Sequence, residues 1–334
     1  MSRTLRDLFR QPPALEGNRS SPERSWLRAA ALTAVVVVLG VGCAKEASSP
    51  GAQPRKTTGT SSFPVSVRAA NGPVVVKARP DNIVSLSPTA TEMLFAVGAG
   101  QQVVAVDDQS DYPPDVPTTS LSGFEPNVEA IVSYEPDLVV AASGKGLKSL
   151  KQLGIALLVA PAANDLEDVY AQVEQIGAAT GHVAPAAEEV ARIRSEIDEI
   201  VDSVAQGGDA PTYYHELDDT YFTVTSRTFI GQIYALAGLQ NIADEAQGAG
   251  TGYPQLSAEY IIEADPDLIF LADSECCNQT PEVVARRPGW DQISAVKNNL
   301  VFDVGDDISS RWGPRVVVFL RRVVDAVAEL RTAR

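Results

Sequence analysis

The sequence predicts an α/β fold made of two similar lobes, each with a central, mostly parallel sheet. Three observations lead to this prediction. Short apolar runs alternate with helical stretches from about residue 83, two segments repeat at an offset of 130 residues, and one long amphipathic stretch lies between them. With 334 residues, of which 45% are apolar, the chain is long enough to bury the cores of two medium-sized domains.

The first lobe is expected to begin with a β-hairpin and to continue with alternating strands and helices. Asn71-Gly72 favours a tight turn between the apolar runs Val65–Val67 and Val74–Val76. Ile83–Leu86 has the composition of a buried strand, and Ser87-Pro88 opens the helix that follows. The remaining elements expected here are strands at 103–106, 138–141 and 157–159 and a helix at 147–153.

The two repeated segments are Glu129–Val139 and Glu259–Ile269. Eight of their eleven positions match in identity or in kind. Each segment reads as a short helix, a Pro-Asp turn and a buried strand, which indicates two lobes of the same construction. The alternative is that this common α/β pattern recurs by chance.

A long helix is expected between the lobes. Pro185 suits a first helical turn, and one apolar face continues to Gly207-Gly208. A helix of about 20 residues spans roughly 30 Å and joins the lobes stiffly, so we expect modest motion between them. The expected division is a first lobe at 64–183, an interdomain helix at 184–206 and a second lobe at 207–334, which ends in an amphipathic helix.

Residues 1–42 have the layout of a secretory signal peptide. Six arginines precede the uncharged, mostly apolar run Ala29–Gly42, which is too short to span a bilayer as a helix. The small residue before Cys43 resembles a bacterial lipobox, in which the cysteine is lipid-modified and begins the mature protein; the alternative is a plain cleaved signal. Residues 43–63 form a tether rich in Ser, Thr, Pro and Gly. We therefore expect an exported domain, lipid-anchored at the outer face of the cytoplasmic membrane.

Composition excludes several classes of function. The chain has 27 lysines and arginines against 43 acids, and a net charge of −16 repels nucleic acid. Two histidines and three cysteines leave little material for a zinc site or a histidine-based active site, and no Gly-x-Ser-x-Gly element is present. We expect no enzyme, no cofactor, no metal site of the protein's own, and a monomer.

Several motifs, in order along the chain, carry a family resemblance. They are Ile83–Glu92, Ser110–Pro113, the two repeated segments, Tyr253–Ser257 and Asp307–Arg315. Together they resemble the substrate-binding proteins of ABC importers, in the helical-backbone branch that serves cobalamin, ferric siderophores and haem. The resemblance covers residues 64–331. It implies two Rossmann-like lobes joined by one long rigid helix, a ligand cleft between the lobes, and an ABC permease with its ATPase as partners.

The resemblance also implies how the protein docks onto its permease. Glu129 and Glu259, one in each lobe, correspond to carboxylates that pair with arginines on the two halves of the permease. Two separated charges of this kind fix the orientation of a docked partner.

For the cargo, the resemblance implies a first-lobe motif at Asp111 and Tyr112 and a second-lobe pair at Asp307 and Arg311. The family's first-lobe tryptophan falls at Gly123 in this sequence, and Tyr253 stands where the family has its second-lobe tryptophan. Aromatic faces and a few polar side chains suit a large flat macrocycle. Further candidates for the ligand site are Phe124, Tyr221, Phe222, Arg227, Tyr253 and Trp312.

Cobalamin is the first choice of cargo, because its apolar face and neutral amides fit these aromatic and polar residues. A ferric siderophore is the alternative, since Arg227, Arg311 and Arg315 could hold an anionic chelate; haem or another metal chelate is a third choice.

Cys276 and Cys277 are adjacent. In an oxidising, exported compartment such a pair can close an eight-membered disulfide ring, and the flanking Glu275 and Asn278 favour a loop. The alternatives are two reduced thiols, or soft ligands for a metal in the cargo.

Overall fold

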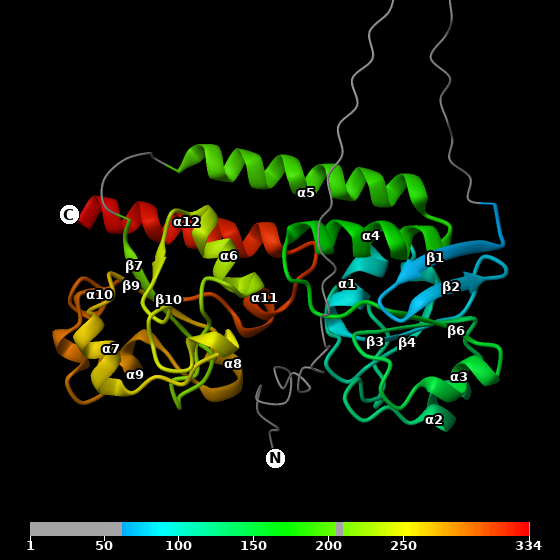
Figure 1. Ribbon diagram of the computed structural model, residues 1–334, viewed down its shortest axis with the longest axis horizontal. Coiled ribbons are helices and arrows are strands. Elements are labelled where there is room, and N and C mark those ends of the chain that lie inside the picture. Colours follow the sequence, from blue (N-terminus) through cyan, green and yellow to red (C-terminus); the bar gives the residue numbers. More distant parts are fainter. Residues whose placement is uncertain (1–61, 205–209, 334) are drawn as a thin grey trace, which may run out of the picture. The chain divides into compact units, whose positions relative to one another are not determined.

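The computed structural model describes residues 62–204 and 210–333 of the chain (Figure 1). The predicted signal peptide, Cys43 and nearly all of the tether lie outside the described residues, so the statements about them stay predictions. Within the described part of the chain, no helix combines the length and the apolar character needed to cross a membrane.

The first sheet has four parallel strands in the order β4-β3-β5-β6. Its strands are continuous apolar runs, because helices cover both faces of the sheet. Val84 and Leu86 pack in one apolar cluster, whereas Ile83 packs in the other. The strands are β3 (Ile83–Leu86), β4 (Val103–Val106), β5 (Leu138–Ala141) and β6 (Ala156–Val159). The helices are α1 (Pro88–Ala96), η2 (Gly100–Gln102), α2 (Val128–Val132), α3 (Lys148–Gln152) and α4 (Leu166–Thr180).

The predicted hairpin consists of β1 (Val65–Ala69) and β2 (Gly72–Val76), paired antiparallel. Gly72 adopts a φ of +96°, a backbone conformation that glycine takes without steric cost. Asn71 ties the turn to β6, because its side chain donates to the Leu157 carbonyl at 2.8 Å and accepts from the Val159 amide at 3.1 Å. The hairpin is therefore attached to the edge of the first sheet.

The second sheet has four parallel strands in the order β10-β9-β7-β8. Helices again flank it, and the aromatic rings of Tyr213, Phe270 and Phe319 pack around the buried Tyr234. The strands are β7 (Thr212–Glu216), β8 (Gln240–Asn241), β9 (Leu268–Leu271) and β10 (Val301–Asp303). The helices are α6 (Phe229–Leu236), η3 (Ala249–Thr251), α7 (Ala258–Ala264), α8 (Ser274–Cys277), α9 (Pro281–Val284), η4 (Trp290–Gln292), α10 (Ser294–Lys297), α11 (Asp306–Ser310) and α12 (Val316–Ala333).

We call the elements from β1 to α4 the first lobe and those from β7 to α12 the second lobe. The order of their strands is equivalent, with β3, β4, β5 and β6 corresponding to β7, β8, β9 and β10. The prediction of an α/β fold with two parallel sheets is confirmed. The domain boundaries drawn from the sequence stay predictions.

The internal repeat extends to backbone detail. Glu135 and Asp265 both adopt left-handed conformations, with φ of 50° and 44°, at the turn before the strand. Two residues later, the Asp137 carboxylate accepts from the Asn82 amide at 3.1 Å, and the Asp267 carboxylate accepts from the Thr212 amide at 2.9 Å. Each aspartate thus joins the starts of two neighbouring strands, at positions 130 residues apart.

A helix of 21 residues, α5 (Val183–Ser203), follows α4 in the segment where the sequence predicts a long helix. Its buried face consists of Ala186, Val190, Ile193, Ile197 and Ile200. It packs against α4 of the first lobe and α12 of the second (Figure 1). The stiffness of this connection stays a prediction.

Candidate functional site

The residues predicted to line the ligand site follow the carboxyl ends of the parallel strands. Asp111, Tyr112 and Phe124 lie after β4, while Asp307 and Arg311 belong to α11 and its end, after β10. In open parallel sheets, ligands bind outside the carboxyl ends of the strands. The two lobes therefore present their candidate residues on the edges where a ligand is expected.

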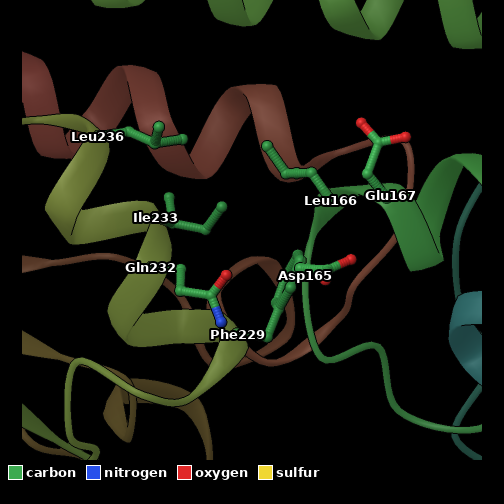
Figure 2. Close-up of a pocket in the computed structure, with 7 residues that line it drawn as sticks. All are labelled: Asp165, Leu166, Glu167, Phe229, Gln232, Ile233 and Leu236. Atoms are coloured by element: carbon green, nitrogen blue, oxygen red, sulfur yellow. The ribbon is translucent and has the colours of Figure 1, made fainter. Parts of the chain in front are cut away.

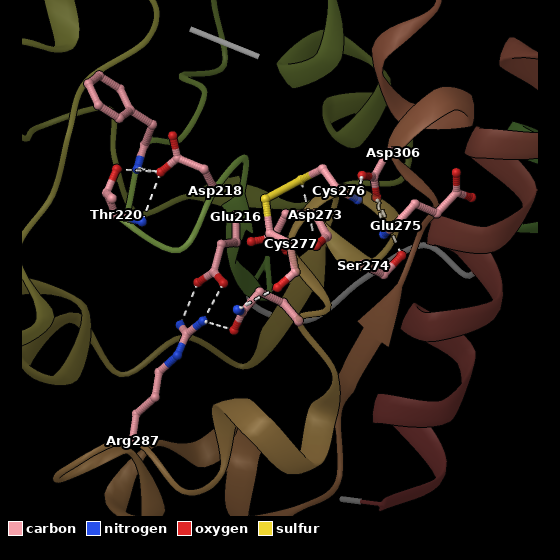
Figure 3. The surroundings of a disulfide bond; sticks show 12 residues. Glu216, Asp218, Thr220, Asp273, Ser274, Glu275, Cys276, Cys277, Arg287 and Asp306 are labelled. Carbon is pink, nitrogen blue, oxygen red and sulfur yellow. Dashed lines mark hydrogen bonds and ion pairs between the residues drawn. A yellow bond between two sulfur atoms is a disulfide. The ribbon is translucent and has the colours of Figure 1, made fainter. Parts of the chain in front are cut away.

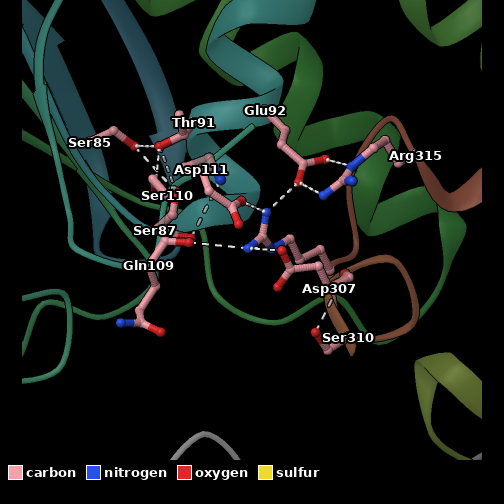
Figure 4. Close-up of polar contacts among 12 residues, drawn as sticks. Ser85, Ser87, Thr91, Glu92, Gln109, Ser110, Asp111, Asp307, Ser310 and Arg315 are labelled. Atoms are coloured by element: carbon pink, nitrogen blue, oxygen red, sulfur yellow. Dashed lines mark hydrogen bonds and ion pairs between the residues drawn. The ribbon is translucent and has the colours of Figure 1, made fainter. Parts of the chain in front are cut away.

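Arg311 of the second lobe forms ion pairs with Glu92 and Asp111 of the first lobe. Both carboxylates are labelled in Figure 4. Arg311 Nη1 lies 3.0 Å from Glu92 Oε1 and 2.9 Å from Asp111 Oδ1. Its Nη2 lies 2.6 Å from Asp307 Oδ2 and donates to the Gln109 carbonyl at 3.1 Å. The side chain is only 8% exposed. Both terminal nitrogens of the guanidinium that was predicted to contact cargo are thus engaged by protein partners.

Glu92 also forms an ion pair with a second arginine from the same segment of the second lobe. Arg315 donates from Nε to Glu92 Oε2 at 2.9 Å and from Nη2 to Glu92 Oε1 at 2.6 Å. The Glu92 side chain is 1% exposed, so this charge depends on its two arginines for compensation. We call Glu92, Asp111, Asp307, Arg311 and Arg315 the cross-lobe ion cluster.

Two carboxyl groups near Arg311 have a raised pKa, and a third has a lowered one. Burial raises the pKa of Asp107 to about 6, against the lowering effect of its hydrogen bond from Ser110. Burial likewise raises the pKa of Asp307 to about 6, with Arg311 opposing the shift. For Asp111, the hydrogen bond and charge of Arg311 outweigh burial and lower the pKa. The protonation of this region therefore changes in mildly acidic solution.

Two aromatic side chains of the first lobe are free to meet a ligand. Tyr112 is 42% exposed and Phe124 is 49% exposed. The guanidinium carbon of Arg315 lies 4.2 Å from the centre of the Tyr112 ring and covers one of its faces. At the neighbouring Gly123, a Cβ atom would lie 2.7 Å from the Leu86 carbonyl oxygen, so no larger side chain fits. Phe124 is the aromatic residue available at this point of the first lobe.

The other predicted ligand contacts are mostly engaged elsewhere. Tyr221 stacks on the buried Trp290, with ring centroids 5.8 Å apart, so it contributes to the core of the second lobe. Trp312 donates from Nε1 to Gln172 Oε1 of α4 at 3.1 Å and thus bonds across the lobes. Arg227 is exposed and donates to the Ala249 carbonyl at 2.5 Å. The Tyr253 ring is partly buried against the core, as is that of Phe222.

The two predicted docking glutamates occupy equivalent, exposed positions. Glu129 is the second residue of α2, which Asn127 caps, and Glu259 is the second residue of α7, which Ser257 caps. The Glu259 backbone amide and the Ser257 hydroxyl hold the pKa of Glu259 below its usual range. Both carboxylates are thus presented to solvent from the first turn of a short helix, one in each lobe.

The adjacent cysteines of α8 are joined by a disulfide (Figure 3). Two residues, Ala272 and Asp273, separate this helix from the end of β9. Asp306, the first residue of α11, accepts hydrogen bonds from the amides of Glu275 and Cys276. The turn therefore contacts the helix that carries Asp307.

A pocket of about 250 Å³ lies where the start of α4 approaches α6 (Figure 2). The Gln232 side chain of α6 donates to the carbonyl of Asn164, which lies just before α4, at 2.7 Å. The volume is below the 300–1,000 Å³ typical of pockets for drug-sized ligands, so a macrocyclic chelate does not fit. Its lining residues are Asp165, Leu166, Glu167, Phe229, Gln232, Ile233 and Leu236.

Sequence reasoning missed Glu92 and Gln172 as partners that join the lobes. A signal for Glu92 was present: it lies inside a helix between Thr91 and Met93, both fully buried. A single charge on a buried helical face requires an opposite charge nearby. The sequence does not indicate that its arginines come from more than 200 positions further along the chain.

Comparison with known proteins agrees with this architecture. The model of the periplasmic binding protein family matches residues 83–308. The ABC transporter substrate-binding lipoprotein YvrC of Bacillus subtilis is 30% identical, over 91% of this chain and 97% of that protein. A cobalamin-binding protein of Halobacterium salinarum is 30% identical, over 88% of this chain and 83% of its own length.

Among solved structures, a possible iron-binding, periplasmic solute-binding protein of Staphylococcus epidermidis superposes with a TM-score of 0.65 at 28% identity. The match covers 75% of this chain and 99% of that one. Proteins of this family bind solutes outside the cytoplasm and are not enzymes, which agrees with the expectation from composition. The chain belongs to the periplasmic binding protein family, as a substrate-binding protein of an ABC transporter.

Proposed function

We propose that this protein captures cobalamin outside the cytoplasmic membrane and delivers it to an ABC permease and its ATPase. One observation carries the choice of cargo: Arg311 and Arg315 are both paired with Glu92. Two of the three arginines that could hold an anionic chelate are therefore already neutralised. The most accessible group of the cross-lobe ion cluster is the Asp111 carboxylate, whose side chain is 66% exposed, followed by Asp307 at 32%.

An acidic rim with exposed aromatic rings suits a large neutral ligand that carries amide donors. Tyr112 and Phe124 supply apolar faces, and Asp111 and Asp307 supply acceptors for amide N–H groups. A corrin ring with peripheral amides has this chemistry. The 30% identity to a protein named as cobalamin-binding supports the same choice.

A ferric siderophore or haem is the second candidate. The exposed Arg227 and the likeness to a possible iron-binding protein favour it. An anionic chelate would have to displace Glu92 from Arg311 or Arg315, which costs a buried ion pair.

Calorimetric titration at low and high ionic strength distinguishes the two cargoes. Cobalamin should bind at micromolar concentration or tighter with little dependence on salt, because it carries little net charge. An anionic siderophore should bind more weakly as salt rises. Absence of cobalamin binding at micromolar concentration, together with salt-sensitive binding of a ferric siderophore, would reject the first proposal in favour of the second.

The exposed aromatic residues provide a matched test of the contact surface. Phe124→Ala removes a ring that buries on the order of 100 Å² against cargo, which lowers affinity by roughly 30- to 150-fold at about 25 cal/mol per Å². Leu153→Ala is the control, since Leu153 is 60% exposed and lies at the end of α3. If the two substitutions lower cargo affinity equally, Phe124 does not contact the cargo.

We further propose that Cys43 carries a lipid anchor and that Glu129 and Glu259 dock onto the permease. Support for the anchor is the sequence around Cys43 together with a relative named as a lipoprotein. Support for docking is the equivalent, exposed placement of the two glutamates. Mass spectrometry of the mature amino terminus tests the anchor directly, because an unmodified terminus at another residue contradicts it.

A further inference from the structure

The disulfide turn at α8 is bonded to α11, the helix that carries Asp307, a proposed cargo contact. The amides of Glu275 and Cys276 donate to the Asp306 carboxylate at 3.1 and 2.8 Å, and Ser274 Oγ lies 3.4 Å from the same group. Asp306 is buried and is the first residue of α11. The start of α11 is therefore held by the amides of the disulfide turn (Figure 3).

Helix α11 leads directly to the cross-lobe ion cluster. Asp307 follows Asp306, and Arg311, at the end of the helix, donates its amide to the Asp307 carbonyl at 3.1 Å. The side chains of Asp307 and Arg311 are paired at 2.6 Å, and Arg311 reaches Glu92 of the first lobe. A continuous series of bonds thus runs from the cysteine pair to the other lobe.

The far side of the turn is fixed by buried groups. The Asp273 carbonyl accepts from the amides of Cys277 and Gln279, and the Gln279 side chain accepts from Arg287 at 2.8 Å. Arg287 is itself held by Glu216, a fully buried residue, at 2.6 Å. Because this base is fixed, a change within the turn displaces its opposite side, where the amides meet Asp306.

Helix α8 has four residues, too few to be stable through its own hydrogen bonds. The bond between Cys276 and Cys277 closes a ring that restricts the backbone at these positions. Cys276 is exposed, so a reductant in solution can reach it.

We propose that the Cys276–Cys277 disulfide positions α11 through Asp306, and that reduction of this bond lowers cargo affinity. The inference rests on the proposed function, because it assigns a redox dependence to the same ligand site. A dithiol supplies two electrons and two protons: the S–S bond breaks, two thiols form, and the dithiol is oxidised to its own disulfide. The cysteines are positioning residues in this scheme and need not touch cargo.

The first experiment needs no cargo. Hydrogen exchange of a Cys43→Ser chain, in which Cys276 and Cys277 are the only cysteines, is compared before and after treatment with dithiothreitol. We expect faster exchange in residues 306–311 after reduction and unchanged exchange in α1. Unchanged exchange in residues 306–311 overturns the proposal, whatever the cargo is.

The second experiment measures cobalamin affinity in both redox states. Reduction should weaken binding by about tenfold, the equivalent of one lost hydrogen bond of about 1.4 kcal/mol. The Cys276→Ser/Cys277→Ser variant should bind cobalamin with the affinity of the reduced protein, and the reductant should not change that affinity. Asp306→Asn should bind weakly and equally in both states, whereas Asp325→Asn, an exposed change on α12, should keep the tenfold difference.

The outcomes separate this proposal from the cargo proposal. Equal cobalamin affinity in the oxidised and reduced protein overturns the positioning role and leaves the function intact. If cobalamin does not bind in either state, the cargo proposal fails, and the hydrogen-exchange result decides the positioning role alone.

Discussion

Glu92→Gln tests whether the cross-lobe ion cluster stabilises the protein. The substitution keeps the shape of the side chain and removes the charge that two arginines share. Glu92 is 1% exposed and accepts three hydrogen bonds from Arg311 and Arg315, at 2.6 to 3.0 Å. Breaking a buried ion pair costs about 3–5 kcal/mol, because the remaining charge is left uncompensated. Since Arg311 keeps Asp111 and Asp307, we expect the lower end, about 3 kcal/mol.

The assay is urea denaturation with a matched control on the surface. Arg192 pairs with Glu189 and Glu196 along α5, but its side chain is 42% exposed. Arg192→Gln should therefore cost no more than about 1 kcal/mol. The shift in midpoint, at an unchanged slope, gives the change in the free energy of unfolding for each variant.

A double-mutant cycle isolates the ion pair from other effects of the substitution. Arg315→Gln should cost less in the Glu92→Gln background than in the wild type, with a coupling of at least about 1 kcal/mol for residues in direct contact. If Glu92→Gln and Arg192→Gln destabilise the protein equally, or if the cycle shows no coupling, the cluster does not hold the lobes as argued.

Three further predictions concern titration and docking. Burial raises the pKa of Asp107 to about 6, so ionisation of this carboxyl opposes folding. Stability relative to Asp107→Asn should fall by about 3 kcal/mol as pH rises from about 3 to about 7, and a parallel pH dependence of the two proteins contradicts this. Burial and Glu216 raise the pKa of Asp273 to about 9, so Asp273→Asn should be at least as stable as wild type at neutral pH in urea denaturation, and a large loss would identify an ionised Asp273. Glu129→Lys/Glu259→Lys should abolish uptake in a transport assay and leave cargo affinity near wild type, and loss of affinity would place these residues in the ligand site.

The elements of the fold were predictable because their signals are local. Ile83–Leu86 and Leu138–Ala141 are apolar runs of strand length, and both are strands. Ser87 caps α1 by accepting from the Ala90 amide, as its position before Pro88 suggested.

The side chains of the site were less predictable because their partners are remote in sequence. Arg311 was identified as polar and near the ligand, but its ion pair with Glu92 joins residues 219 positions apart. The sequence also placed Tyr221 among the ligand contacts, whereas its ring lies on Trp290. An aromatic residue in a loop indicates a preference for burial and does not indicate which of two neighbouring surfaces it covers.

The internal repeat separates what the lobes share from what they do not. Two pairs of equivalent positions keep the same chemistry. Glu129 and Glu259 lie in the first turn of the proposed docking helices, and Asp137 and Asp267 each join the starts of two strands. In the proposed docking, a permease with two equivalent halves would need the same carboxylate from each lobe, which gives this surface a reason to stay symmetric.

At the carboxyl ends of the strands the lobes differ. Ser85 and Ser143 of the first lobe correspond, at an offset of 130, to His215 and Asp273 of the second. Only the second lobe, within the described residues, carries a disulfide turn at this edge. A metal chelate with two different faces requires different partners from the two lobes. The asymmetry of these edges therefore fits a role in recognising cargo, while the symmetry of the docking helices fits a role in recognising the permease.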